Sequence, residues 1–72
     1  MKVHGTVRFI DVETGAWVLD TDDGQTLLLA GGDRKLKKAG ARIEAEGELD
    51  AEAVTAQMVG PRFVVKSYRF LG

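Results

Sequence analysis

The chain has 72 residues, of which 44% are hydrophobic and 29% charged, with a net charge of −1 and no cysteine. This is the balance of an ordinary soluble globular protein, and it excludes disulfides, a thiol nucleophile and a thiolate metal site. No apolar run approaches the about 20 residues that a bilayer crossing needs, and a dedicated nucleic-acid binder would usually carry a basic surplus. We expect a single domain over residues 1–72, and a cytoplasmic protein because no apolar signal segment precedes the first strand pattern.

The first strand is predicted over Val3 to Ile10, where apolar and polar residues alternate. Its core-facing residues would be Val3, Gly5, Val7 and Phe9. A glycine in the middle of this face predicts a bend, since glycine permits strong coiling at a barrel corner.

A hairpin is predicted over Ala16 to Ala30, with Asp22-Asp23-Gly24 as a three-residue loop. This loop pairs Leu19 with Leu27 and Trp17 with Leu29. A two-residue turn would shift the register and separate these large side chains. The register predicts a buried core containing Val7, Trp17, Leu19, Leu27, Leu29 and Ile43.

Gly31 and Gly32 end this hairpin, and Asp33 is a good N-cap for a short helix over Arg34 to Ala39 that Gly40 closes. Leu36 and Ala39 are the apolar residues of that helix, so we expect it to dock as a plug.

Two further strands are predicted in the second half. Arg42 to Leu49 alternates with Ile43, Ala45, Gly47 and Leu49 inward. Residues 50–58 fit either a strand-bearing arm or a helix start, of which we favour the strand. The last strand runs from Phe63 to Leu71, with a bulge near Ser67 that turns Val65, Tyr68 and Phe70 inward and Lys66 and Arg69 outward.

This succession resembles the oligonucleotide/oligosaccharide-binding (OB) fold, an all-β, five-stranded Greek-key barrel with a short helix between strands three and four. The motifs that carry the resemblance are Gly5-Thr-Val, Trp17 to Gly24, Gly40 to Gly47 and Val65-Lys-Ser-Tyr68. The chain also looks like short, uncharacterised single-domain bacterial members of that fold, so the resemblance implies a fold and no activity. An SH3-like barrel is the alternative.

The sequence contains few residues that could carry out enzyme catalysis. His4 and Ser67 are the only histidine and serine, and neither has triad companions at a suitable spacing. Asp20, Asp22 and Asp23 fail the spacing of a calcium loop and are better explained as turn residues. We therefore expect no enzyme, no catalytic residue, no metal site and no cofactor.

The basic residues decide between two binding hypotheses. The strand order that the resemblance implies would set Glu44, Glu46 and Glu48 between two pairs of cations, Lys2 and Arg8 on one side and Lys66 and Arg69 on the other, so that ion pairs use these charges. A cluster then remains on the predicted helix. Weak single-stranded nucleic-acid or oligosaccharide binding would use Arg8, Arg34, Lys35, Lys37 and Lys38.

The hairpin register turns Val18 and Leu28 outward, as a small apolar patch on the outer face of the second and third strands. We expect these two side chains to be visible to solvent and to contact a protein partner or a second copy of the chain. The leading hypothesis is thus a non-catalytic binding or interaction module, with weak nucleic-acid or oligosaccharide binding as the alternative.

Overall fold

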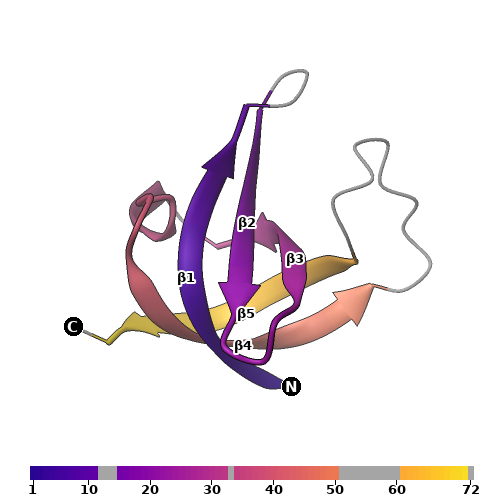
Figure 1. The fold of residues 1–72 in the computed structure, drawn as a ribbon. Helices are drawn as coiled ribbons and strands as arrows, with labels where there is room; N and C mark the ends of the chain where they lie inside the picture. Colours follow the sequence, from indigo (N-terminus) through magenta and orange to yellow (C-terminus); the bar gives the residue numbers. More distant parts are fainter. Residues whose placement is uncertain (12–14, 33, 51–60, 72) are drawn as a thin grey trace.

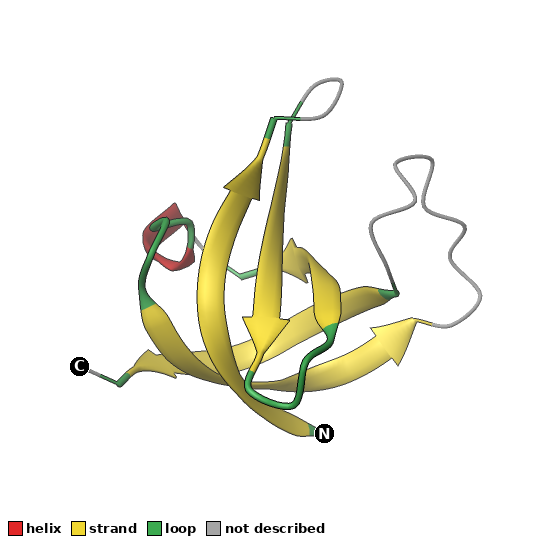
Figure 2. Ribbon diagram, in the orientation of Figure 1, coloured by secondary structure: helices red, strands yellow, loops and turns green. Residues whose placement is uncertain are grey.

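The computed structural model describes residues 1–11, 15–32, 34–50 and 61–71. Within these ranges the protein is all-β, and its strands form a closed barrel in the order β1-β2-β3-β5-β4 (Figures 1 and 2). This is the order that the resemblance implies. None of the described helical residues forms a segment long and apolar enough to cross a membrane. The elements are β1 (Lys2–Ile10), β2 (Ala16–Thr21), β3 (Thr26–Gly31), the 3-10 turn η1 (Arg34–Leu36), β4 (Arg42–Asp50) and β5 (Arg62–Phe70).

β1 closes the barrel because it pairs with two strands, β4 along its first half and β2 along its second (Figure 1). Gly5 belongs to both ladders. A Cβ atom at Gly5 would lie 2.3 Å from the backbone oxygen of Asp20, and one at Gly47 would lie 1.9 Å from that of Val64. Both predicted glycine positions are therefore points where two backbones approach too closely for a side chain.

The β2–β3 hairpin has the predicted register. Leu19 pairs with Leu27 and Val18 pairs with Leu28. The loop closes through a hydrogen bond from the Thr21 N–H to the Gln25 carbonyl, at 2.8 Å, and Gly24 adopts φ +93°. A left-handed residue at this place is what a three-residue hairpin loop requires.

β5 lies between β3 and β4 and pairs differently with each. Its ladder with β3 is parallel and runs from Leu28↔Arg62 to Gly31↔Val65, whereas its antiparallel ladder with β4 runs from Asp50↔Arg62 to Ile43↔Phe70. The second ladder shifts where Glu46 pairs with Ser67 and Gly47 with Val65, so Lys66 is the extra residue of a bulge. The bulge predicted near Ser67 is confirmed.

The barrel interior confirms most of the predicted core. Val7, Leu19, Leu27 and Ile43 are fully buried, whereas Trp17 and Leu29 are half-buried and pack against them. The other buried members of this core are Leu36, Ala45, Phe63 and Val65.

Three residues predicted to face the core are exposed: Phe9 at 45%, Leu49 at 40% and Phe70 at 44%. The prediction that these residues are buried is wrong, because each lies within one residue of the end of its strand. The alternation of a strand gives the face of a side chain, but not how far the opposite wall extends.

The predicted helix over Arg34 to Ala39 is shorter than expected. Its described residues form only the 3-10 turn η1, and Ala39 is exposed. The reason is that the next residues pair with β1: the Gly40 N–H donates to the Val7 carbonyl at 2.7 Å, and the Val7 N–H donates to the Ala41 carbonyl at 2.9 Å. The plug itself is confirmed, since Leu36 is 1% exposed and belongs to the core.

The predictions for the N-cap at Asp33 and for residues 51–58 fall outside the described residues.

Candidate binding surface

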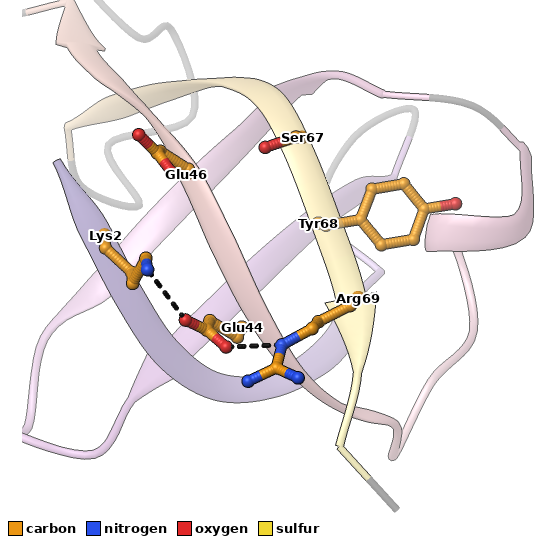
Figure 3. Close-up of a pocket in the computed structure, with 6 residues that line it drawn as sticks. All are labelled: Lys2, Glu44, Glu46, Ser67, Tyr68 and Arg69. Carbon is orange, nitrogen blue, oxygen red and sulfur yellow. Dashed lines mark hydrogen bonds and ion pairs between the residues drawn. The ribbon is translucent and has the colours of Figure 1, made fainter.

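Glu44 on β4 is the centre of a cluster of charged side chains on the outer wall of the barrel (Figure 3). Its carboxylate accepts a hydrogen bond from Arg69 Nε at 2.6 Å and lies 3.2 Å from Lys2 Nζ. His4 Nε2 lies 3.8 Å from the same carboxylate. The three partners come from the two strands that flank β4, so this cluster joins β1, β4 and β5. The predicted ion pairs of Lys2 and Arg69 with this strand are confirmed.

These contacts hold Glu44 in its ionised form. The hydrogen bond from Arg69 is the largest cause that lowers the pKa of Glu44, and the hydrogen bond from Lys2 is the second. The side chain is only 11% exposed, and the hollow beside it has a volume of about 180 Å³. A carboxylate kept ionised by two cations is poorly suited to donate a proton, so the Glu44 cluster is best explained as a clamp between strands.

Two other acidic residues engage cations on the β1–β2 side of the barrel. Arg8 donates two hydrogen bonds to the Asp20 carboxylate, at 2.6 and 3.0 Å, and Arg42 donates two to Asp22, at 2.8 and 3.0 Å. In each pair the hydrogen bond from the guanidinium is the largest cause that lowers the pKa of the aspartate. The predicted partners of Arg8 on β4 are therefore wrong: Arg8 pairs with β2, its other neighbour in the barrel.

A hollow larger than the one beside Glu44 lies along the second half of β5. It has a volume of about 580 Å³ and is lined by Gly32 and by the six residues from Val65 to Phe70. Among the described lining residues, Lys66 and Arg69 contribute two cations, Tyr68 and Phe70 contribute two aromatic rings, and none is acidic. We call this feature the β5 groove.

The aromatic rings of the β5 groove form a pair. The Tyr68 and Phe70 centroids are 5.6 Å apart with the planes at 86°, an edge-to-face arrangement. Tyr68 packs against the core, and Figure 3 shows its ring on the side of β5 away from Glu44. Phe70 is 44% exposed. One ring is thus anchored by packing, and the other presents apolar surface to solvent.

The cations of the β5 groove are only partly occupied. Lys66 makes no ion pair with any residue that the structure describes. Arg69 binds Glu44 through Nε, and its side chain is 74% exposed. The groove therefore keeps a positive character although the whole chain has a net charge of −1.

β5 extends at this place beyond its ladder with β3. The ladder with β3 ends at Gly31↔Val65, where Gly31 and Gly32 both adopt a positive φ and the chain turns away. The Leu71 N–H donates to the Arg42 carbonyl at 2.9 Å, so the amide of Leu71 points toward β4. Because successive residues of a strand direct their backbone groups to opposite sides, the amide of Phe70 points away from β4, toward the groove.

The predicted interaction patch of Val18 and Leu28 is only half correct. The two residues are direct neighbours across the β2–β3 ladder, as predicted. Val18 is nevertheless fully buried and Leu28 half-buried, so the expectation that both are visible to solvent is wrong. Arg8 is the β1 partner of Val18, and its side chain binds Asp20, two residues further along the same face.

The residues predicted for nucleic-acid binding lie in two places. Arg8 is engaged with Asp20, while the four other cations are exposed on the connection between β3 and β4. That connection returns to β1 at Val7, next to Arg8, but the Arg8 guanidinium is directed toward β2. The structure thus leaves a basic cluster apart from Arg8, consisting of Arg34, Lys35, Lys37 and Lys38.

Among the described residues, no three histidine, aspartate or glutamate side chains come together in a way that could hold a metal ion. His4 contacts Glu44 but is itself on the exposed wall of β1.

The sequence contains a signal for the β5 groove, because cations and aromatic residues alternate in order from Lys66 to Phe70. The predicted ion pairs of both cations with β4 conceal this signal. Within the described residues only Arg69 makes such a pair. Where the β3 ladder ends depends on the left-handed turn at Gly31 and Gly32, which alternation along β5 does not reveal.

Comparisons of the chain with protein-family models, with curated proteins and with solved structures find no match.

Proposed function

We propose that the protein is a non-catalytic binding module of the OB type whose ligand is a segment of another protein. The observation that supports this proposal most strongly is the β5 groove, which combines an exposed aromatic ring, two cations and an open strand edge. Exposed apolar surface beside a strand that continues past the end of a ladder is typical of a protein-binding site. The proposed contact therefore moves from Val18 and Leu28 to Lys66, Tyr68, Arg69 and Phe70.

A protein ligand explains more of the groove than a nucleic acid does. A single strand of nucleic acid would use the aromatic rings and the cations but not the backbone edge. Its affinity would also depend on phosphate neutralisation, and the chain as a whole carries no basic surplus. Weak single-stranded nucleic-acid or oligosaccharide binding remains the second candidate, favoured by the alternation of Lys66 and Arg69 with two aromatic residues.

Selection from a random linear peptide library tests the proposal. Enriched peptides would be synthesised and titrated against the wild-type protein, Phe70→Ser and Phe9→Ser. The two phenylalanines are a matched pair, since they are 44% and 45% exposed. We expect Phe70→Ser to lose binding and Phe9→Ser to retain it.

The same titrations with an oligo(dT) of 12 nucleotides, at low and physiological salt, provide the opposing test. We expect binding no tighter than high micromolar and a steep loss with added salt. Submicromolar oligo(dT) binding at physiological salt, together with no enriched peptide, would overturn the proposal in favour of nucleic acid.

A further inference from the structure

We infer that the β5 groove takes an extended, acidic protein segment that adds to the barrel as a strand along Lys66–Phe70. This inference rests on the proposed function and specifies the ligand: its backbone pairs with the open edge of β5, and its side chains alternate between apolar and acidic. Three observations carry it, namely the end of the β3 ladder, the alternation of side chains along β5 and the two cations, Lys66 and Arg69, that line the groove.

The first observation provides the room for a strand. β5 continues for five residues beyond Val65, its last partner on β3, while its ladder with β4 continues to Phe70. One side of Lys66–Phe70 is therefore a strand in a ladder, and the other side borders the 580 Å³ groove. An extended peptide in that groove would lie beside β5 where β3 no longer pairs with it. Its main-chain hydrogen bonds would provide affinity that does not depend on the sequence of the peptide.

The second observation determines which side chains the ligand needs. Beyond the bulge at Lys66, Tyr68 and Phe70 lie on the face whose β4 partners are the buried Ala45 and Ile43, whereas Arg69 pairs with Glu44 on the outer face. Neighbouring strands present side chains to the same two faces. In a bound segment, apolar residues would therefore lie beside Tyr68 and Phe70, and the residues that alternate with them would lie on the face of the cations.

The third observation selects an acidic segment over a second copy of the chain. Another β5 strand would bring its own Lys66 and Arg69 to a groove that already holds these two cations. A lysine and a bulge on a strand edge are also devices that hinder pairing between identical edges. Carboxylates would instead meet the ammonium of Lys66 and the two terminal nitrogens of Arg69, whose Nε binds Glu44.

The test uses three capped hexapeptides titrated into isotopically labelled full-length protein, with amide shifts as the readout. Glu-Val-Glu-Val-Glu-Val has the proposed pattern, Glu-Glu-Glu-Val-Val-Val has the same composition as two blocks, and Lys-Val-Lys-Val-Lys-Val reverses the charge. We expect the first to bind about tenfold tighter than either control, because only its pattern sets valines beside the aromatic rings and carboxylates beside the cations at the same time. The largest shifts should fall on residues 66–70.

Two further variants separate the backbone from the charge. N-methylation of the peptide on alternate residues removes the donors of one edge, so one of the two alternate sets should abolish binding and the other should not. Lys66→Glu should weaken the acidic peptide about fivefold or more, whereas Lys37→Glu, the same charge change on the connection between β3 and β4, should not.

The outcomes distinguish the inference from the function on which it rests. If library peptides bind but shift the amide signals of residues around Phe9 and Trp17, the proposed binding module stands and strand addition at β5 is refuted. Self-association that Lys66→Glu strengthens would replace the acidic segment with a second copy. Oligo(dT) binding at residues 66–70, with no peptide bound, would overturn both proposals.

Discussion

Val18 shows how a residue can have the predicted neighbour and the wrong exposure. Its pairing with Leu28 follows from the turn at Asp22-Asp23-Gly24, which lies within the same hairpin. Its burial does not follow from that turn, because Val18 also has β1 as a neighbour, where Arg8 is its partner and binds Asp20. Local pattern determines the first property, and the second depends on how the strands assemble.

Replacing Val18 with lysine should therefore destabilise the protein strongly. A charge at a fully buried position loses its hydration, and we expect a loss of about 3 kcal/mol or more in the free energy of unfolding. Leu28→Lys is the matched control, because half-buried Leu28 can extend a lysine to solvent at a cost within about 1 kcal/mol. Urea unfolding followed by circular dichroism measures both, and equal losses would contradict the burial described for Val18.

Gly47 gives a second prediction at this scale. A methyl group would meet the Val64 backbone oxygen at 1.9 Å, and neither backbone can move without breaking the β4–β5 ladder. We expect Gly47→Ala to cost about 2 kcal/mol or more. A Cβ added at Gly24 would meet no atom within 4 Å. Gly24→Ala should therefore lower the free energy of unfolding by only about 1 kcal/mol, the cost of a left-handed conformation for alanine. Thermal unfolding that ranks the two variants in the opposite order would refute the close approach.

The strands β1, β4 and β5 are connected by more than their ladders, because the Glu44 cluster bridges all three. Lys2 and Arg69 approach the same carboxylate from opposite sides (Figure 3). Charge pairing on this face was predictable from the alternation of Glu44, Glu46 and Glu48. Its concentration on one glutamate depends on the register between the strands, since Glu44 pairs with both His4 and Arg69.

The Glu44 cluster predicts a pH dependence with a definite sign. The pKa of Glu44 is lowered in the folded protein, so its ionised form stabilises the fold above the ordinary carboxylate pKa of about 4.3. That contribution disappears as the pH falls through the lowered value. In Glu44→Gln the free energy of unfolding should fall less steeply below about pH 4 than in the wild type.

Glu46→Gln is the control for this experiment, since Glu46 makes no ion pair within the described part of the chain. Its pH profile should follow that of the wild type. If Glu44→Gln instead kept the full acid sensitivity, the Glu44 cluster would not stabilise the fold through the ionised carboxylate.

At the scale of the whole molecule, the barrel was predictable to the extent that each strand contains its own signals. The alternation of residues 42–49, the hairpin loop and the bulge that keeps Arg69 outward each follow from neighbouring residues. The ends of the strands were not predictable in this way. Phe9, Leu49 and Phe70 share the core-facing side of their strands and are exposed because the opposite wall stops short.

The candidate site belongs to this second category. The β5 groove exists because Gly31 and Gly32 turn the chain away from β5 before β5 ends. Residues around Phe70 could suggest an aromatic and basic strand, but not that its edge is open. A binding site that forms where β5 continues beyond β3 can be recognised only from the assembled barrel.

The most direct test of the proposed strand addition is hydrogen exchange at the Phe70 amide, with and without the Glu-Val-Glu-Val-Glu-Val peptide. This amide points away from β4, whereas that of Leu71 already donates to Arg42 and serves as the internal reference. Strand addition predicts that saturating peptide slows exchange at Phe70 at least about tenfold and leaves the rate at Leu71 nearly unchanged, because a new main-chain hydrogen bond must open before exchange. Binding with an unaltered exchange rate at Phe70 would contradict the account.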